Sequence, residues 1–195
     1  MAKREDFYYR EAKRLGYRAR SAFKLIQIQR RFNIIREGDL VLDLGAAPGS
    51  WCQVIRKIVG KSGRVIGIDI SPFTPINDVV FIRGDVTSEE TKERLREILS
   101  GEKLNVVLSD LSPKTSGVHS LDHARSIWLG EHALKYAEEF LSKKGNFVCK
   151  LFEGEESLRF RKKLEKIFST VRYFSPKASR KESSEKYIIA KGFKG

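Results

Sequence analysis

The sequence has few cysteines and histidines and no long apolar segment, and each shortage excludes a class of protein. Its 195 residues include two cysteines, Cys52 and Cys149, and three histidines. That is too little for a disulfide framework or a recognisable metal site, and it suits a reducing compartment. No apolar run approaches the ~20 residues of a membrane helix, and residues 1–6 lack the apolar core of a signal peptide. We therefore expect a cytoplasmic protein with no metal site and no membrane segment.

Acidic residues are also in short supply, because 25 Asp and Glu face 38 Lys and Arg and leave a formal net charge of +13. Such an excess favours a polyanionic partner, since each phosphate contact releases counterions. Residues 3–31 carry many of these cations, and the aromatic rings among them are Phe7, Tyr8, Tyr9, Tyr17 and Phe23. We expect two helices here, separated at Gly16. Base stacking with phosphate contact and a solvated amphipathic extension explain this segment equally well.

Strand-length apolar segments alternate with helical ones along the rest of the chain. Strands are predicted at residues 39–44, 64–69, 78–85, 104–110, 145–150, 170–174 and 184–190. No helix fits between the last two, so the final strand should run antiparallel to a mostly parallel sheet. This predicts a doubly wound, Rossmann-like α/β fold with helices on both faces. We expect a single domain over residues 1–195, with residues 1–35 as a basic helical extension.

The stretch from Asp39 to Ile55 is a strand, a small-residue turn and the start of a helix. Gly45 and Gly49 bracket the turn, where free N–H groups at the helix start favour an anion. The dinucleotide motif G-x-G-x-x-G is absent, which disfavours a nucleotide-dependent oxidoreductase and suits a smaller anion such as a carboxylate. Asp43 can accept from an ammonium group, and carboxylate plus ammonium is the amino-acid end of S-adenosylmethionine. A turn that binds no ligand is the alternative.

Acidic residues also follow the next two predicted strands, on the edge of the sheet where such folds bind ligands. Asp69 lies 24 positions after Gly45, near the spacing of a ribose-binding carboxylate. Asp85 is placed to meet an adenine amino group, with Val86 packing beside it. Each acid alone is often only a turn residue.

The other half of the same edge carries residues of both signs. Asp110 and Lys150 end strands there, and Glu185 begins the antiparallel strand, so the three should lie together. Lys24 can reach them from the N-terminal helices. We expect the apolar neighbours of Lys150, Phe147 and residues 151–152, to cover its aliphatic stem. Whether Lys150 acts as a neutral base or as a charged steering group stays open.

Five separated segments together resemble the FtsJ/RrmJ (RlmE) family of S-adenosylmethionine-dependent RNA ribose 2′-O-methyltransferases. They are residues 17–25, 43–51 (DLGAAPGSW), 109–113, 150–154 (KLFEG) and 184–187. The resemblance implies a class I methyltransferase fold and a catalytic tetrad made of Lys24, Asp110, Lys150 and Glu185. It also implies S-adenosylmethionine contacts at Gly49, Trp51, Asp69, Asp85 and Asp110. One departure from the family pattern is Ser50: this chain has Gly-Ser-Trp at residues 49–51, where the bacterial enzymes of the family have Gly-Gly-Trp.

We expect a monomer. The resemblance implies that its substrate is RNA, most directly a uridine in large-subunit ribosomal RNA. A tRNA anticodon loop is the alternative substrate, because no motif separates the two. A basic RNA-binding module without catalysis is the alternative of a different class, and the presence of all four tetrad residues argues against it.

Overall fold

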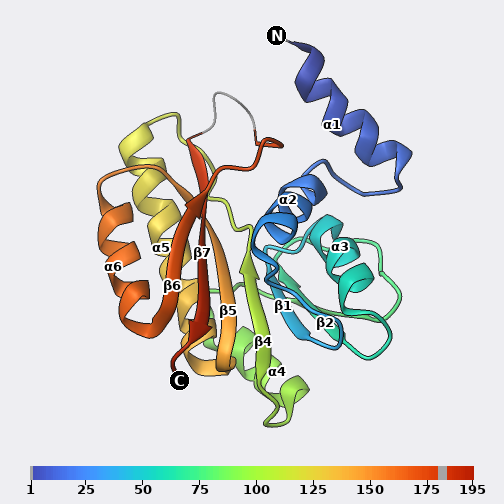
Figure 1. The fold of residues 1–195 in the computed structure, drawn as a ribbon, viewed down its shortest axis with the longest axis vertical. Coiled ribbons are helices and arrows are strands. Elements are labelled where there is room, and N and C mark those ends of the chain that lie inside the picture. Colours follow the sequence, from blue (N-terminus) through green and yellow to red (C-terminus); the bar gives the residue numbers. More distant parts are fainter. Residues whose placement is uncertain (1, 180–183) are drawn as a thin grey trace.

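The computed structural model describes residues 2–179 and 184–195, with side chains from residue 7 onward in the first helix. Within this part of the chain, seven strands form one sheet in the order β3-β2-β1-β4-β5-β7-β6 (Figure 1). The helices are α1 (Ala2–Arg14), α2 (Ala22–Phe32), α3 (Ser50–Val59), α4 (Glu89–Leu99), α5 (His119–Phe140) and α6 (Glu156–Ile167). The strands are β1 (Leu40–Leu44), β2 (Arg64–Asp69), β3 (Val79–Arg83), β4 (Leu104–Ser109), β5 (Leu141–Phe152), β6 (Phe168–Phe174) and β7 (Glu185–Phe193).

Strand direction follows the prediction. The pairs β1–β2, β2–β3, β1–β4 and β4–β5 are parallel, whereas β7 is antiparallel to both of its neighbours, β5 and β6. The carboxyl ends of β1 to β5 and the amino end of β7 therefore meet at one edge of the sheet. The predicted Rossmann-like fold is confirmed, with several strand boundaries moved. The largest shift is in β5, which begins at Leu141 and not at Gly145, and its register with β4 shifts between Leu104 and Val106.

Two hydrophobic cores lie on the two faces of the sheet because side chains alternate along each strand. In β1, Leu40, Leu42 and Leu44 pack with α4, α5 and α6, whereas Val41 packs with α2 and α3. The same alternation places Leu108 of β4 and Val148 of β5 on the α2–α3 side. Residues two positions further along these strands should therefore emerge on that side as well.

Helix α2 is part of the α2–α3 core, where Leu25 and Ile28 are fully buried. It ends at Asn33, whose backbone has a left-handed φ of 48° and whose N–H donates to the Gln29 carbonyl. Helix α1 stands apart from the sheet (Figure 1), and its Phe7 and Tyr9 are 53% and 61% exposed. The expected helix pair is present, but only α1 has the character of an extension.

No helix in the described part of the chain is long and apolar enough to cross a membrane.

Candidate active site

Four residues predicted from separate parts of the sequence meet at the edge of the sheet. Lys24 Nζ of α2 lies 2.6 Å from Glu185 Oε1 at the start of β7. Lys150 Nζ of β5 lies 3.1 Å from Asp110 Oδ1 and donates to the Asp110 backbone carbonyl at 2.7 Å. The alternation of the strands explains the meeting, because Asp110 and Lys150 each follow a residue of the α2–α3 core by two positions.

A fifth residue, Tyr187, joins the two ion pairs into one network. Its phenolic oxygen lies 2.6 Å from Asp110 Oδ1 and 2.8 Å from Glu185 Oε1. Tyr187 is fully buried, and burial followed by the charges of Asp110 and Glu185 raises its pKa well above the ordinary value for a phenol. The hydroxyl therefore stays protonated and donates its one hydrogen to these two acceptors. The sequence analysis did not select Tyr187, although its position two residues after Glu185 on a strand was a usable signal.

Lys150 is 8% exposed, and the source of its burial differs from the prediction. Phe147 and Leu151 belong to the core on the opposite face of the sheet, because they are an odd number of positions away from Lys150. The residue paired with Lys150 across the antiparallel ladder is Tyr187. The expectation that Phe147 and Leu151 cover the lysine stem was therefore wrong.

Among the described residues, the hydrogen bonds of Lys150 leave one direction at Nζ open. An ammonium group has three donors, and two of them are directed at the carboxylate and the backbone carbonyl of Asp110. The third position can meet a hydroxyl oxygen brought to the edge of the sheet. With only small exposed fractions on the side chains of both ion pairs, water screens these charges little.

His123 of α5 holds the loop that follows Lys150. The Glu156 N–H donates to His123 Nε2 at 3.2 Å, so Nδ1 carries the ring proton and donates to the Phe152 carbonyl at 2.9 Å. Ser126, one turn further along α5, accepts from the Phe152 N–H at 3.0 Å. These three bonds fix the end of β5, and no pattern in the sequence indicates them.

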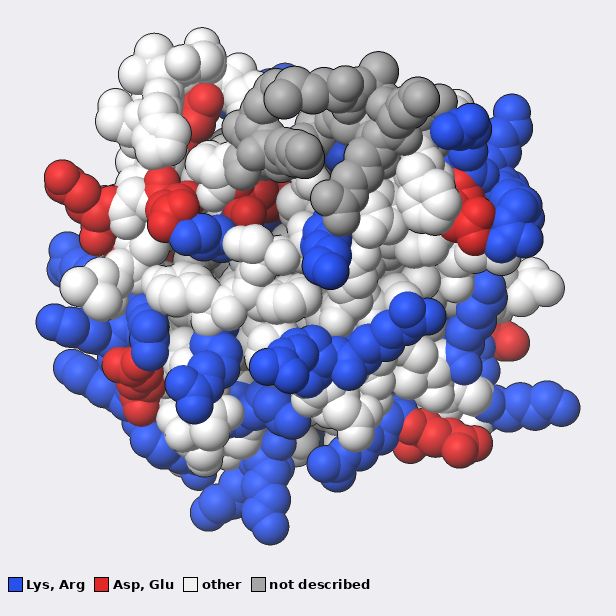
Figure 2. Space-filling view, turned by 45° about the horizontal axis from the view of Figure 1, so that its top comes forward, with Lys and Arg blue, Asp and Glu red and all other residues white. Residues whose placement is uncertain are grey.

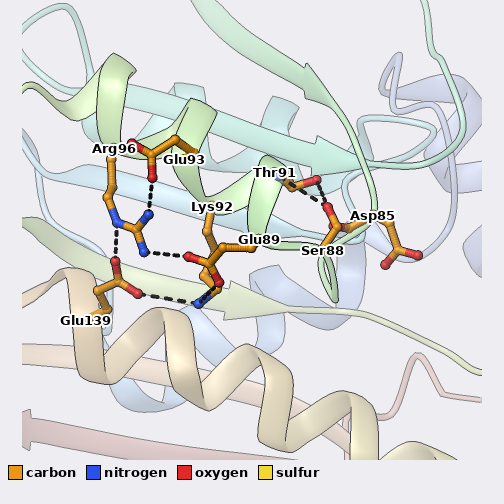
Figure 3. A network of polar contacts seen from close by, with 8 residues as sticks. All are labelled: Asp85, Ser88, Glu89, Thr91, Lys92, Glu93, Arg96 and Glu139. Carbon is orange, nitrogen blue, oxygen red and sulfur yellow. Dashed lines mark hydrogen bonds and ion pairs between the residues drawn. The ribbon is translucent and has the colours of Figure 1, made fainter.

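A pocket of about 350 Å³ lies at the same edge of the sheet as the network, where β2, β3 and β4 end. Three predicted ligand-binding residues, Asp69, Asp85 and Val86, line it together with Leu111, the neighbour of Asp110. Asp69 accepts from the N–H groups of Ala47 and Ser71 and thereby fixes the turn after β1. Asp85 Oδ1 accepts from Thr87 at 2.8 Å. Figure 3 shows the Asp85 carboxylate pointing away from the charged side chains of α4.

Asp43 lies in β1, just before the turn, and does not line this pocket. It is 0% exposed, its Oδ2 accepts from the Cys52 thiol at 3.2 Å, and its Oδ1 has no hydrogen-bond partner among the described residues. Burial raises the pKa of Asp43 to about 7, and the charges of Asp110 and Asp69 add to the effect.

The remaining predicted residues shape the turn and the start of α3. Gly45 has a φ of 81°, and a Cβ there would lie 3.1 Å from the backbone nitrogen of Leu111. Gly49 has a φ of 101° and abuts the guanidinium of Arg18. Trp51 is 2% exposed, donates from Nε1 to the Ser21 carbonyl at 2.9 Å and packs its ring 5.8 Å from that of Tyr187. The Trp51 ring therefore supports the network and does not face the pocket.

No three His, Cys, Asp or Glu side chains gather as a candidate metal site among the residues that the structure describes.

The fold and the site together define a class: an open, doubly wound α/β protein with lysines and acids gathered at the carboxyl ends of its strands. The family model described as FtsJ-like methyltransferase matches residues 17–193. The chain belongs to this family, and it is a methyltransferase.

Individual relatives agree with this assignment. Ribosomal RNA large subunit methyltransferase E from Archaeoglobus fulgidus is 49% identical over 194 residues, which cover 100% of this chain and 99% of the relative. The protein of the same name from Methanoculleus marisnigri is 51% identical over 191 residues, covering 98% of this chain and 93% of the relative. A solved structure from Plasmodium falciparum, described as a ribosomal RNA methyltransferase, has a TM-score of 0.84 at 30% identity and covers 92% of this chain and 100% of that one.

Proposed function

We propose that this protein transfers a methyl group from S-adenosylmethionine to a ribose 2′-hydroxyl, that of a uridine, in large-subunit ribosomal RNA. The observation that carries the proposal is the joined network of Lys24, Glu185, Tyr187, Asp110 and Lys150, at the same edge of the sheet as the acid-lined pocket. The names of the relatives, which are ribosomal RNA large subunit methyltransferases, support the substrate. The formal charge of +13 suits an RNA partner.

The residues present fit S-adenosylmethionine. Asp69 and Asp85 line a pocket where they can accept from the ribose hydroxyls and the adenine amino group, and Val86 packs beside them. At the amino-acid end, Asp110 is an acceptor for an ammonium, while the unpartnered Oδ1 of Asp43 is a buried acceptor that the described residues leave unused. The tight turn at Gly45 and Gly49 leads into the N-terminus of α3, whose first N–H groups suit a carboxylate. Trp51 anchors the first turn of α3 through its hydrogen bond to the Ser21 carbonyl.

The chemistry needs placement more than activation. When bound, the cofactor supplies a methyl group on a sulfonium, which is already a strong electrophile. The protein has to hold the 2′-oxygen in line with that methyl at ~3–3.5 Å and to accept or orient the hydroxyl proton. As an ammonium, Lys150 would donate its third N–H to the 2′-oxygen and orient the hydroxyl, and as a neutral amine it would accept the hydroxyl proton on the lone pair at that position.

The other four residues keep Lys150 in position. Asp110 fixes Lys150 through two contacts, and Tyr187 couples Asp110 to Glu185. Lys24 balances the charge of Glu185, so that two cations and two carboxylates share a pocket that water screens little. Removing one charged member would leave its partner uncompensated.

Ribose methylation mapping tests the proposal. We expect the purified protein to transfer labelled methyl groups from S-adenosylmethionine to large-subunit RNA, and a strain lacking the gene to lose one ribose methylation in that RNA. Loss at a tRNA anticodon loop instead would replace the substrate while keeping the reaction. Absence of transfer to any RNA would leave a non-catalytic RNA-binding module and overturn the proposal.

We further propose that the protein acts in the cytoplasm as a monomer. The two cysteines are free and buried, which suits a reducing compartment. Light scattering of the purified protein tests the monomer.

A further inference from the structure

A groove of about 720 Å³ lies between α5 and α6, outside the site described above. Figure 1 shows the two helices side by side on one face of the sheet. Six of the residues that line it are Trp128 and Glu131 on α5 and Arg159, Lys162, Lys163 and Lys166 on α6. The α6 residues recur at intervals of three and four, which places them on one face of the helix.

The cations of this groove have no ion-pair partner in the described part of the chain. Arg161, on the same helix, pairs with Glu165 at 2.8 Å, whereas Arg159, Lys162, Lys163 and Lys166 are exposed and unpaired. Glu131 and Glu156 are the acids that line the groove, so the four cations leave it with a positive excess. Lys and Arg also outnumber Asp and Glu over the face seen in Figure 2. A strand of phosphates would relieve the repulsion among these cations.

Trp128 links the groove to the candidate active site. It lines both this groove and the pocket that contains Asp69 and Asp85. Its side chain is 51% exposed, and His132 contacts it edge-on with ring centroids 4.5 Å apart. A half-exposed indole beside unpaired cations is the combination that binds single-stranded nucleic acid, because bases stack on the ring while the cations contact phosphates.

We propose that the α5–α6 groove binds a single-stranded segment of the RNA substrate, with phosphates on the α6 cations and a base against Trp128. The inference rests on the proposed function, since it assumes that the substrate is RNA. An acidic peptide would use the cations but would gain nothing from the indole, so RNA is the occupant that uses both features.

Paired substitutions test the role of the cations. The variant Lys162→Gln/Lys163→Gln removes two unpaired charges from the groove. The control variant, Lys61→Gln/Lys143→Gln, removes two exposed lysines near the starts of β2 and β5, at the edge of the sheet opposite the candidate active site. Affinity for deproteinised large-subunit RNA is measured at several salt concentrations. We expect the groove variant to bind about tenfold more weakly and to lower the salt slope by about 1.4, since each lost phosphate contact to a single strand lowers it by about 0.7. The control should keep the wild-type slope, and equal changes in both variants would overturn the proposal.

The tryptophan content gives a second readout on the unmodified protein. The chain has two tryptophans, and Trp51 is 2% exposed whereas Trp128 is 51% exposed. Quenching by acrylamide therefore reports mainly on Trp128. With the cofactor pocket saturated by S-adenosylhomocysteine, addition of the RNA should reduce the quenching by half or more. Unchanged quenching would show that RNA leaves the groove open.

Methyl transfer to the same RNA separates the two proposals. If the wild-type protein methylates the RNA but the groove variant binds it with unchanged affinity and slope, the groove inference fails alone. If the wild-type protein methylates no RNA, the proposed function fails. If an acidic peptide protects Trp128 and RNA does not, the assignment of the occupant is overturned.

Discussion

Two charged networks in this protein use the same side-chain chemistry in different surroundings. In the candidate active site, the charged residues come from four separate elements: α2 (Lys24), the end of β4 (Asp110), β5 (Lys150) and β7 (Glu185). Their side chains are 8–16% exposed. Around α4, Arg96 contacts Glu89, Glu93 and Glu139, with side chains 32–66% exposed (Figure 3).

The difference lies in what each network leaves available. Around α4, neighbours on one helix and one residue of α5 pair with each other on a surface that water reaches. At the edge of the sheet, residues distant in the sequence are held with one Lys150 direction open. Exposed pairs contribute little to stability, whereas breaking a buried pair is costly. The comparison indicates that the buried network is kept for chemistry, and the following predictions test it.

The largest effect is expected for Lys150→Ala. Loss of the group that receives or orients the hydroxyl proton should lower the rate of methyl transfer at least about 10³-fold, while affinity for S-adenosylmethionine changes little. Single-turnover transfer and calorimetric binding measure the two quantities. Lys92→Ala is the matched control, because Lys92 lies 2.8 Å from Glu89 in the α4 network. Near wild-type turnover in Lys150→Ala would remove Lys150 from the mechanism.

Asp43 is a buried acid without a cation beside it, and Asp43→Asn should change how stability depends on pH. The folded protein holds the Asp43 proton up to about pH 7, whereas the unfolded chain releases it near pH 3.8. Between these values the folded state binds more protons, so the free energy of unfolding falls as pH rises and levels off above about pH 7. From pH 5 to pH 8 the wild type should lose on the order of 3 kcal/mol relative to Asp43→Asn.

Urea denaturation of both proteins at pH 5 and pH 8 measures this difference, since other titrating groups cancel between them. If the free energies of unfolding of the two proteins differed by the same amount at both pH values, Asp43 would be ionised over this whole range, and the prediction would be wrong.

Local sequence patterns were sufficient for the sheet and for Asp110, Lys150 and Glu185 at its edge, whereas the role of Lys24 in the network was implied by the family resemblance. Strand ends and the antiparallel last strand follow from apolar runs and from a link too short for a helix, and together they determine which residues share an edge. The face on which each side chain emerges was not used, so the wrong neighbours were assigned to Lys150 and Tyr187 was missed. The His123 contacts depend on how α5 packs against the end of β5, which no local pattern encodes.

Part of the candidate ligand site also follows from local pattern. Asp69, Asp85 and Val86 were placed by counting strand ends, and they share a pocket. Trp51 and Asp43 were chosen by motif alone, and the depth at which each is buried depends on the packing of α3 on the sheet. The single domain over residues 1–195 and the ligand contacts of these residues stay predictions.

Tyr187→Phe sharpens the comparison by removing only the hydroxyl that couples the two ion pairs. Asp110 and Glu185 would each lose a donor, and we expect a 10- to 100-fold lower transfer rate with little change in the affinity for S-adenosylmethionine. The pH profile of transfer is recorded together with the rate in both variants. Tyr173→Phe is the control, because the Tyr173 hydroxyl donates to the Ser157 carbonyl outside the network. Equal rates and pH profiles in the two variants would reduce Tyr187 to a packing residue.

The smallest effect is expected at the α4 network. Arg96→Gln removes the cation shared by three acids, yet each acid is exposed enough for water to replace the lost contact. The melting temperature should fall by at most about 3 °C, and transfer activity should stay within twofold of wild type. Differential scanning calorimetry and the transfer assay measure both. A large loss of activity would mean that the α4 charges reach the ligand pocket through the neighbouring Asp85 turn, and the division between a structural and a chemical network would not hold.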